Sequence, residues 1–227
     1  MMIFEDIFRE YEKLAAKAET AFDEARKEHP SLVRCRESCS DCCNSVFGLF
    51  LVESLYLGRH FSKLDRKIRR EAASRAEKAD RDLLEMEKRL SAYDVDPKMK
   101  AQAMAKERVR CPLLGDDDRC VLYSRRPVTC RAYGIPTVIS GNIHSCWMAG
   151  FQKDKVFPAF DLDGVYSELY GLSRKVLARS GVRDMERASL LVPVSKSIKT
   201  PFEDLIKSIK ATEDSDPVKG IKKSPGN

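Results

Sequence analysis

The chain has 227 residues, of which 43% are hydrophobic and 33% charged, and its formal net charge is +6. This length suits one domain with appendages. Acidic residues are interleaved with the basic ones, which argues against the single-sign stripe of a nucleic-acid-binding surface. No apolar run approaches the ~18 residues of a membrane span, and the N-terminal segment lacks the basic and apolar regions of a signal peptide. The sequence therefore predicts a cytoplasmic protein without a membrane or nucleic-acid partner.

The first predicted element is a long amphipathic helix over residues 2–28, within an N-terminal segment (1–34) that packs on the core. Its apolar residues recur at steps of three and four, which places them in one stripe. His29-Pro30 ends the helix, because the residue before a proline is disfavoured in the helical conformation. The stripe consists of Ile3, Phe4, Ile7, Phe8, Tyr11, Leu14, Ala15, Ala18 and Phe22.

Half of the eight cysteines follow within nine residues, separated by polar side chains. A buried cysteine normally packs as a small hydrophobic residue, so polar neighbours argue against a core role. Several thiolates this close together need a cation to be stable, and disulfides are uncommon in a reducing cytosol. Adjacent side chains diverge, so we expect Cys39 and one of the pair Cys42 and Cys43 to bind the primary metal. The first cysteine segment contains Cys35, Cys39, Cys42 and Cys43.

A helix is predicted next, over Val46–His60. Its apolar positions form one face, and Glu53 lies off that face.

Residues 63–92 predict a long, highly charged helix, supported by acid–base pairs four residues apart. Asp96-Pro97 ends it, and a short helix runs on to about Lys106. We interpret residues 63–106 as a helical insertion in a metal-binding domain that spans residues 35–150. The charged helix also offers a surface for a protein partner.

The second cysteine segment begins with a predicted β-hairpin. Gly115-Asp116-Asp117-Asp118 is a turn sequence with apolar residues on both sides. The hairpin would hold Cys111 and Cys120 close together at its two ends. The three aspartates lack the alternating ligand spacing of a calcium loop.

A short helix is predicted after Pro127, which suits a first helical turn, and it would carry Cys130 and Arg131. Cys146 follows beyond another turn, at residues 140–142. Its neighbour His144 is expected at the surface, because cysteines already suffice for a tetrahedral metal shell.

The remainder of the chain predicts a C-terminal helical segment, residues 151–211. It contains an amphipathic helix over Leu162–Arg179, which Ser180-Gly181 ends. Residues 212–227 are polar and rich in Lys, Asp, Pro and Gly, so a disordered tail is expected there.

The two cysteine segments together resemble the YkgJ-like CxxCxxCC cysteine-cluster family, which is described as a zinc- or iron-chelating domain. The resemblance covers roughly residues 35–150, and its second half, C-x-L-Y-x-x-R-P-x-x-C-R-x-Y from Cys120 to Tyr133, is long and specific. One departure is the gap between Cys35 and Cys39, which holds three residues rather than two. A related cysteine-rich domain occurs in flagellin lysine N-methylases, so the resemblance also makes iron–sulfur and methyl-transfer chemistry conceivable.

The spacing of Cys35, Cys39 and Cys42 matches that of radical S-adenosylmethionine enzymes as well. Against this reading, the motif does not follow the first strand of a βα barrel, and the chain is too helical for such a barrel. No glycine-rich nucleotide loop accompanies it.

The leading hypothesis is a cytosolic metal-binding protein with one cysteine-ligated site formed by both segments. Four thiolates would complete the shell of a zinc ion or hold iron as a [4Fe–4S] cluster. Arg126 and Arg131 would serve as cofactor-binding residues that offset the negative charge and donate hydrogen bonds to sulfur. The candidate metal ligands are Cys35, Cys39, Cys42, Cys43, Cys111, Cys120, Cys130 and Cys146.

Two alternatives stay open. A metal- or iron–sulfur-dependent redox or group-transfer enzyme, including a methyl-transfer-like one, would use Cys42 or Cys43 as a reactive thiol. A partner-binding scaffold would bind a protein partner through the charged helix 63–92, and the metal would serve only to stabilise the fold. The expected fold is mainly α in each case, with amphipathic helices around a cysteine-rich loop and β-hairpin metal site.

Overall fold

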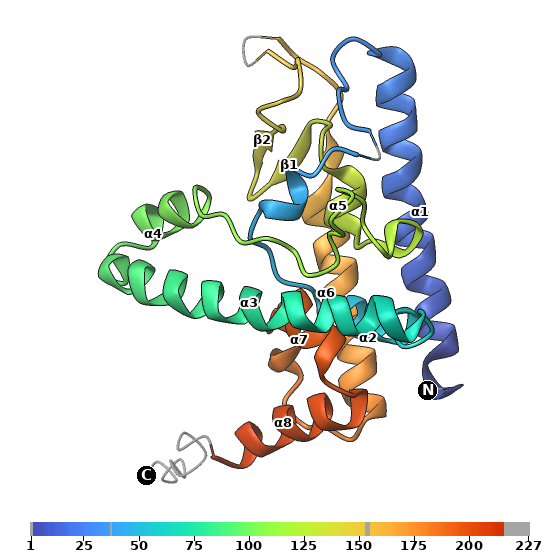
Figure 1. The fold of residues 1–227 in the computed structure, drawn as a ribbon, viewed down its shortest axis with the longest axis vertical. Coiled ribbons are helices and arrows are strands. Elements are labelled where there is room, and N and C mark those ends of the chain that lie inside the picture. The colour runs from blue at the N-terminus through green and yellow to red at the C-terminus, as the bar shows by residue number, and fades with distance from the viewer. Residues whose placement is uncertain (1, 37, 153–154, 216–227) are drawn as a thin grey trace, which may run out of the picture.

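The computed structural model describes residues 2–36, 38–152 and 155–215, and it is mainly α, as predicted (Figure 1). The α-helices are α1 (Glu5–Glu28), α2 (Leu51–Phe61), α3 (Arg66–Leu90), α4 (Pro97–Met104), α5 (Val128–Ala132), α6 (Leu162–Arg179), α7 (Val194–Lys199) and α8 (Phe202–Ser215). The strands are β1 (Thr137–Ile139), β2 (Asn142–His144) and β3 (Phe160–Asp161). Short 3-10 helices are η1 (Met2–Phe4), η2 (Cys42–Asn44), η3 (Ser91–Tyr93), η4 (Tyr123–Arg125) and η5 (Met185–Ser189).

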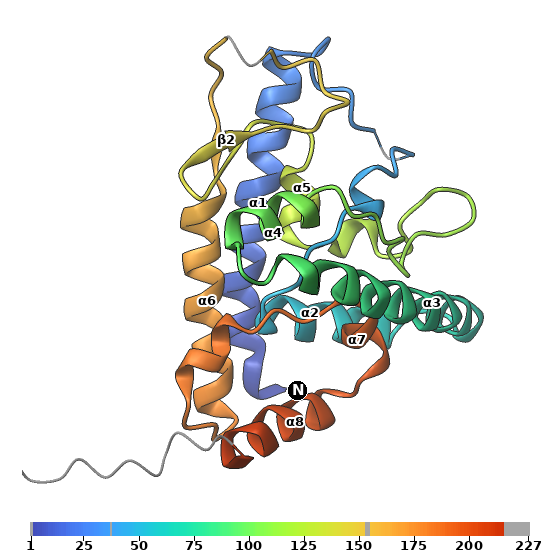
Figure 2. The same ribbon diagram turned by 90° about the vertical axis from the view of Figure 1, so that its left-hand side faces the viewer.

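Helices α1 and α6 lie side by side and run antiparallel (Figures 1 and 2). Ion pairs follow this arrangement: Lys17 meets Glu168 at 3.2 Å, and Lys175 meets Glu10 at 2.6 Å. The predicted stripe of α1 is buried from Phe4 to Phe22, whereas Ile3 is exposed. Both helices therefore form where their apolar spacing predicts, and they bury their stripes against each other, α2 and α5.

Helix α2 differs from the prediction, because it begins at Leu51 rather than at Val46. Leu49 and Val192 exchange two backbone hydrogen bonds, of 2.9 and 2.8 Å, which hold the preceding residues extended. Gly48 fits this pairing closely, since a Cβ atom there would lie 2.5 Å from the Leu191 Cβ. Long-range pairing thus overrides the local helical pattern. Residues 51–57 are all buried, so the helix has no solvent-exposed face along this stretch.

The predicted hairpin between Cys111 and Cys120 is shorter than expected. The turn is present, and its two sides meet in an antiparallel bridge between Leu114 and Cys120, with backbone hydrogen bonds from Gly115 to Arg119 at 2.8 Å and from Val121 to Leu113 at 2.9 Å, but no strand extends from it. Leu113 and Leu114 are both buried, whereas successive residues of a strand face opposite sides. Pro112 also lacks the amide that a ladder requires. This segment is therefore a compact turn.

A small sheet that the sequence did not predict forms at residues 137–161, in the order β2-β1-β3. Strands β1 and β2 are antiparallel, and Ser140 and Gly141, at the predicted turn, both have positive φ angles (52° and 71°). Such angles are typical of a two-residue hairpin turn. Asp163 accepts hydrogen bonds from both turn amides, at 2.8 and 2.9 Å, which fixes the hairpin to α6.

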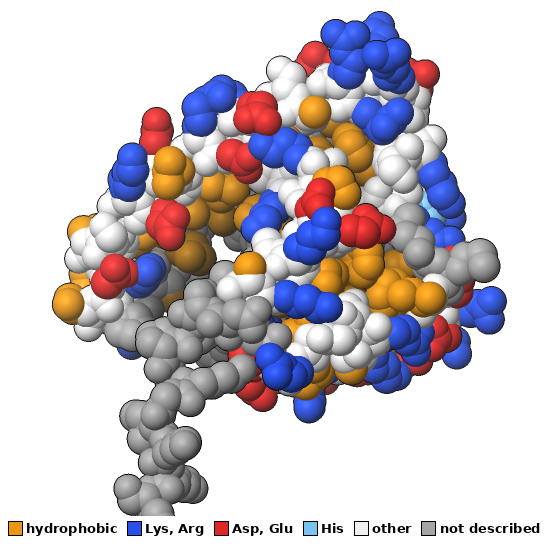
Figure 3. All heavy atoms as spheres, turned by 90° about the horizontal axis from the view of Figure 1, so that it is seen from below, with side chains coloured by type: hydrophobic (Ala, Val, Ile, Leu, Met, Phe, Trp, Pro, Cys, Tyr) orange, Lys and Arg blue, Asp and Glu red, His pale blue; other side chains and the backbone are white. Residues whose placement is uncertain are grey.

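Helices α3 and α4 form an arm that projects from the helical body (Figure 1). The arm meets the body through α7, where Lys199 pairs with Glu77 at 2.8 Å and also with Asp80. The predicted charged helix is confirmed, with Asp65 as its N-cap. Figure 3 shows acidic and basic side chains interspersed on the face seen from below.

The main core contains residues from the N-terminal segment, the cysteine-containing region and the C-terminal segment. Helix α1 comes from the first, α2 and α5 come from the second, α6 comes from the third, and these helices pack together. Helix α8 extends to Ser215 and includes the first four residues of the expected tail, and residues 216–227 lie outside the described residues. Across the described ranges, no helix combines the length and the apolar character that spanning a membrane requires.

Candidate metal centre

The first cysteine segment is a loop of tight turns that ends in η2. The amide of Cys39 donates to the carbonyl of Arg36 at 2.8 Å, and the amide of Cys43 donates to the carbonyl of Ser40 at 3.0 Å. Small polar residues such as Ser40 favour turns of this kind. The turns bring the cysteines of this segment onto a short, curled stretch of backbone.

The second segment is tied directly to the first by backbone hydrogen bonds. The amide of Cys111 donates to the carbonyl of Cys43 at 2.6 Å, and that of Val109 donates to Asn44 at 3.1 Å. Ser45 and Arg108 form an antiparallel bridge beside them. Two stretches more than sixty residues apart in sequence therefore lie together.

Helix α5 brings Cys130 to the same place, and a buried carboxylate of α2 caps this helix. Glu53 is 2% exposed and accepts a hydrogen bond from the amide of Val128 at 3.0 Å. Burial raises the pKa of Glu53 to about 7, although the amides of Val128 and Phe50 and the Tyr11 hydroxyl act in the opposite direction. Glu53 lies off the apolar stripe of its helix, yet the structure buries it, and its side chain joins α2 to the helix that carries Cys130.

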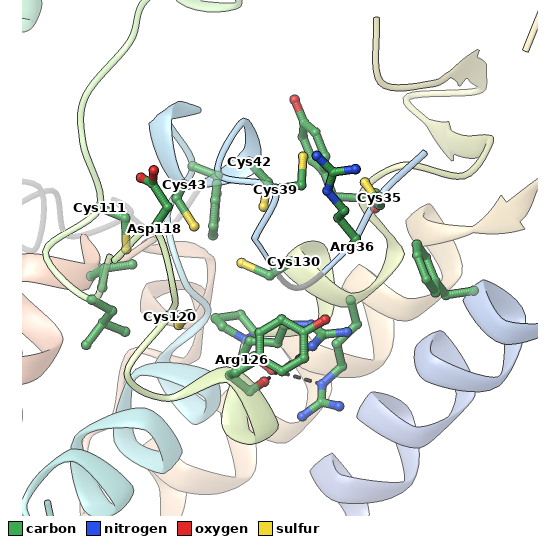
Figure 4. Close-up of a pocket in the computed structure, with 18 of the residues that line it drawn as sticks. Cys35, Arg36, Cys39, Cys42, Cys43, Cys111, Asp118, Cys120, Arg126 and Cys130 are labelled. Carbon is green, nitrogen blue, oxygen red and sulfur yellow. Dashed lines mark hydrogen bonds between the residues drawn. The ribbon is translucent and has the colours of Figure 1, made fainter. Parts of the chain in front are cut away.

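Seven of the eight cysteines, from both segments, line one cavity of about 330 Å³. Figure 4 shows Cys111 and Cys43 on one side of it, Cys35 and Cys39 on the other, and Cys130 between them. All eight cysteines are free thiols. The seven are Cys35, Cys39, Cys42, Cys43, Cys111, Cys120 and Cys130.

Arg126 and Arg131 also line the cavity, and Glu19 of α1 binds both of them. Arg126 reaches one carboxylate oxygen at 2.9 Å, and Arg131 reaches the other at 2.6 Å. The guanidinium group of Arg126 stacks 4.0 Å from the centre of the Tyr123 ring. The charge of Arg126 lowers the pKa of the Cys42 thiol, although other influences on that thiol outweigh it. The fork geometry of arginine suits such a shared carboxylate.

Five cysteines form one group, called here the five-cysteine group: Cys42, Cys43, Cys111, Cys120 and Cys130. Burial raises the pKa of Cys130, and the neighbouring charges of Cys42, Cys111 and Cys120 add to the shift. Burial likewise raises the pKa of Cys111 to about 12. A hydrogen bond with Cys43 and burial raise the pKa of Cys42. Cys42, Cys111 and Cys130 are therefore hard to ionise unless a cation compensates the charge.

The other three cysteines, called here the three-cysteine group, are Cys35, Cys39 and Cys146. Burial and then the charges of Cys39, Cys146 and Cys42 raise the pKa of Cys35 to about 12, so this group adjoins the five-cysteine group. The Cys35 thiol faces the carbonyl of Tyr133 at 3.5 Å. Cys146, which does not line the cavity, lies against the Asp41 carboxylate at 3.6 Å. His144, the other candidate in this stretch, is exposed in β2.

The kind and number of donors fit a thiolate-bound metal. Within the described parts of the chain, no three Cys, His, Asp or Glu side chains form a ready-made group that could hold an ion; the thiols surround the cavity instead. A cysteine sulfur moves among staggered positions about one torsion, so side-chain rotation can carry these sulfurs into the cavity. Zinc and iron–sulfur centres both use such thiolates.

In a comparison with protein families, the family CxxCxxCC, described as "Putative zinc- or iron-chelating domain", matches residues 34–146. Residues 34–146 thus resemble a CxxCxxCC domain. No curated protein and no solved structure matches the chain. The match spans both cysteine segments, so metal chelation is the function that the family description and the clustered thiols support together.

The candidate site also includes residues that the sequence did not single out. Glu19 lies on the polar face of the first helix, where nothing in the spacing marks it. Asp41 stands between cysteines, and this position could have indicated a role in the site. The sequence otherwise marks it only as one of several polar loop residues. Gly134 has a φ angle of 107°, and a Cβ atom there would lie 2.4 Å from the Cys35 sulfur. Asp118 lines the cavity as well, from the predicted turn.

Proposed function

We propose that the chain binds a cysteine-ligated iron–sulfur cluster, held by four thiolates of the five-cysteine group. The observation that carries this proposal is the single cavity that cysteines of both segments line. When bound, such a cluster supplies a site for electron transfer or for Lewis-acid chemistry.

The size of the cavity favours a cluster over a lone zinc ion. Thiolates stand only ~2.3 Å from zinc in a closed tetrahedral site, which leaves no room between ligands and ion. The cavity here measures about 330 Å³, and a polynuclear centre would occupy more of it.

The surrounding charges favour the same centre. Four thiolates around a cluster leave net negative charge, which basic groups beside the site offset. Arg126 and Arg131 supply two such groups, and Glu19 holds them in place. Their role is to set the electrostatic potential of the cavity.

An enzymatic role of the redox or group-transfer class would use the same cavity. Five thiols exceed by one the four that a cluster needs. Cys42 and Cys43 are neighbours in sequence, so one of them suits the spare position. A thiol beside the centre would then be the reactive group.

The test is purification of the full chain without oxygen, followed by measurement of iron, zinc, acid-labile sulfide and visible absorption. Equal amounts of iron and sulfide with a broad charge-transfer absorption are expected. Cys130→Ser should remove most of the iron, whereas Ser124→Ala, at an exposed position within η4, should retain it. Zinc alone without sulfide would refute the cluster, and absence of any metal would refute chelation.

A further inference from the structure

A second cavity, of about 320 Å³, opens at the C-terminal end of α1, which is the upper end of that helix in Figure 1. It lies between this end of the helix and the segment that contains β3, and it is called here the α1-end cavity. It shares no lining residue with the cysteine-lined cavity. Its volume falls in the range of small-molecule sites, about 300–1,000 Å³.

Aromatic side chains form much of the wall of the α1-end cavity. Phe151 and Phe160 line it, and both pack against a buried apolar cluster. His29 also lines it, and its ring lies edge to face with that of Phe151, with 6.2 Å between the centroids. The ring of Phe157 lies edge to face with both, at 5.4 Å from His29 and 5.0 Å from Phe151. These mutual contacts hold the aromatic wall in one arrangement.

Helix α1 contributes two alanines and two glutamates from a single face. Ala21, Glu24, Ala25 and Glu28 all line the cavity, and their spacing of three and four residues places them on that face. The alanines are partly buried and leave the space open, whereas the glutamates are exposed at the rim. The cavity is therefore apolar inside and acidic at its edge.

The charge at this rim has one sign. Of the described residues that line the cavity, three are acidic and none is Lys or Arg. One acid, Asp161, is the N-cap of α6 and accepts from the amide of Gly164 at 2.9 Å, so the helix terminus offsets its charge. Glu24 and Glu28 form no ion pair with another described residue. Like charges four residues apart on a helix repel each other, so a cation beside them would stabilise both.

The arrangement suits an organic cation better than a metal ion. Within the described ranges of the chain, no three Cys, His, Asp or Glu side chains come close enough together to hold a metal ion. An alkylated ammonium group needs no such coordination, because its charge is spread over its alkyl groups. Aromatic rings attract it, and recognition of quaternary ammonium groups uses aromatic walls of this kind.

We propose that the α1-end cavity binds a small organic cation of the quaternary ammonium class. Its alkyl groups contact Phe151 and Phe160, and its positive charge lies towards Glu24 and Glu28. This binding activity goes beyond metal chelation and does not depend on the proposed cluster. No covalent bond is formed or broken.

The first test uses the wild-type chain, purified with its metal, and so is independent of folding defects. Choline and its uncharged isostere, in which a tert-butyl group replaces the trimethylammonium group, are titrated separately. Saturation-transfer NMR of their methyl groups gives the two Kd values. Choline should bind at least about tenfold more tightly, because only choline gains attraction from the rings and the carboxylates. Equal affinities, or no saturable binding of choline, would overturn the proposal.

The second test locates the site with paired variants. Ala25→Leu should abolish saturable choline binding, because the larger side chain fills the cavity and leucine is a good helix former. Ala16→Leu, at an exposed position of the same helix, should leave binding unchanged. Glu28→Gln should weaken binding of choline by about 2–5-fold and leave that of the isostere unchanged, whereas Glu87→Gln, exposed in α3, should affect neither.

Choline binding that persists in Ala25→Leu, or is lost equally in Ala16→Leu, would place the cation elsewhere and overturn the proposal. Iron and sulfide are measured in the same samples. Their absence would refute the proposed function alone, because the α1-end cavity contains no cysteine.

Discussion

The helical body and the cysteine-lined region are stabilised in different ways. The body, made of α1, α2 and α6, buries continuous apolar surface, and Ile7, Leu169 and Val176 are fully enclosed. The cysteine-lined region has little regular structure beyond η2, η4 and α5, and its interior consists of thiols and arginines around a cavity. Apolar burial stabilises the first region by itself, whereas the second contains thiols such as Cys111 and Cys130 whose charged forms burial disfavours.

Carboxylates from the body are what connect the two regions. Glu19 of α1 binds Arg126 and Arg131, and Glu53 of α2 caps the helix that carries Cys130. The comparison teaches that the scaffold positions the cysteine-lined region through a few polar contacts of buried or half-buried carboxyl groups. Each prediction below alters one side of this comparison.

Metal removal should have the largest effect, because structural sites of this kind contribute ~10–16 kcal/mol of binding free energy in small zinc-dependent peptides. Chelation should increase amide hydrogen exchange in residues 35–45 and 108–134 and leave α1 and α6 protected. Mass spectrometry of exchanged peptides measures this directly. A uniform increase over the whole chain would mean that the body also depends on the metal.

Leu169→Ala should destabilise the body by about 2–5 kcal/mol, because it removes a fully buried side chain and leaves a cavity. Urea unfolding followed by circular dichroism measures the free energy of unfolding. The metal content under native conditions should stay unchanged. Leu84→Ala is the matched control, since Leu84 is 53% exposed and its loss should cost less than about 0.5 kcal/mol. If Leu169→Ala and Leu84→Ala lowered the free energy of unfolding equally, the result would contradict a close-packed helical body.

Glu53 should make stability depend on pH. Its folded-state pKa of about 7 lies above the ordinary value of 4.5, so its contribution is fully present below pH 4.5 and is lost as the pH rises through 7. The full shift corresponds to about 3 kcal/mol. Glu53→Gln should remove this decline, measured as the difference from wild type at equal metal content. Glu24→Gln, at an exposed position of α1, should not. Parallel pH profiles for wild type and Glu53→Gln would refute the prediction.

Glu19→Gln should have the smallest effect, about 1–2 kcal/mol, because Arg126 and Arg131 would lose a charged acceptor that is itself 36% exposed. Thermal unfolding and metal retention are the measurements. Glu168→Gln breaks a well-exposed ion pair of the body and should cost below ~1 kcal/mol. A larger loss in Glu168→Gln than in Glu19→Gln would mean that the link between body and site is unimportant.

Predictability followed the range of the interactions. Helices α1 and α6 were predictable almost to the residue, because their signals are local spacing and capping. The turn at residues 140–142 was predictable for the same reason, but its strands were too short to show any alternation. The helix expected at Val46 failed because Leu49 pairs with Val192, a partner that no local pattern reveals.

The site divides in the same way. The cysteines, their two segments and the neighbouring arginines could be recognised from the sequence. Clustered thiols and the C-x-L-Y-x-x-R-P-x-x-C-R-x-Y pattern are defined by residue type and spacing along the chain alone. Glu19, Asp41 and Gly134 could not be recognised in this way, because each acts on a residue about 100 positions away.

The sequence by itself determined that the chain is mainly helical and that eight thiols gather in two segments, because side-chain periodicity and ligand chemistry are properties of neighbouring residues. Only the tertiary structure decided which thiols share a cavity, which carboxylates reach them, and where the backbone leaves room for a sulfur. These outcomes depend on the packing of α1, α2 and α5 against one another, and packing distances between remote residues are set by the folded chain as a whole.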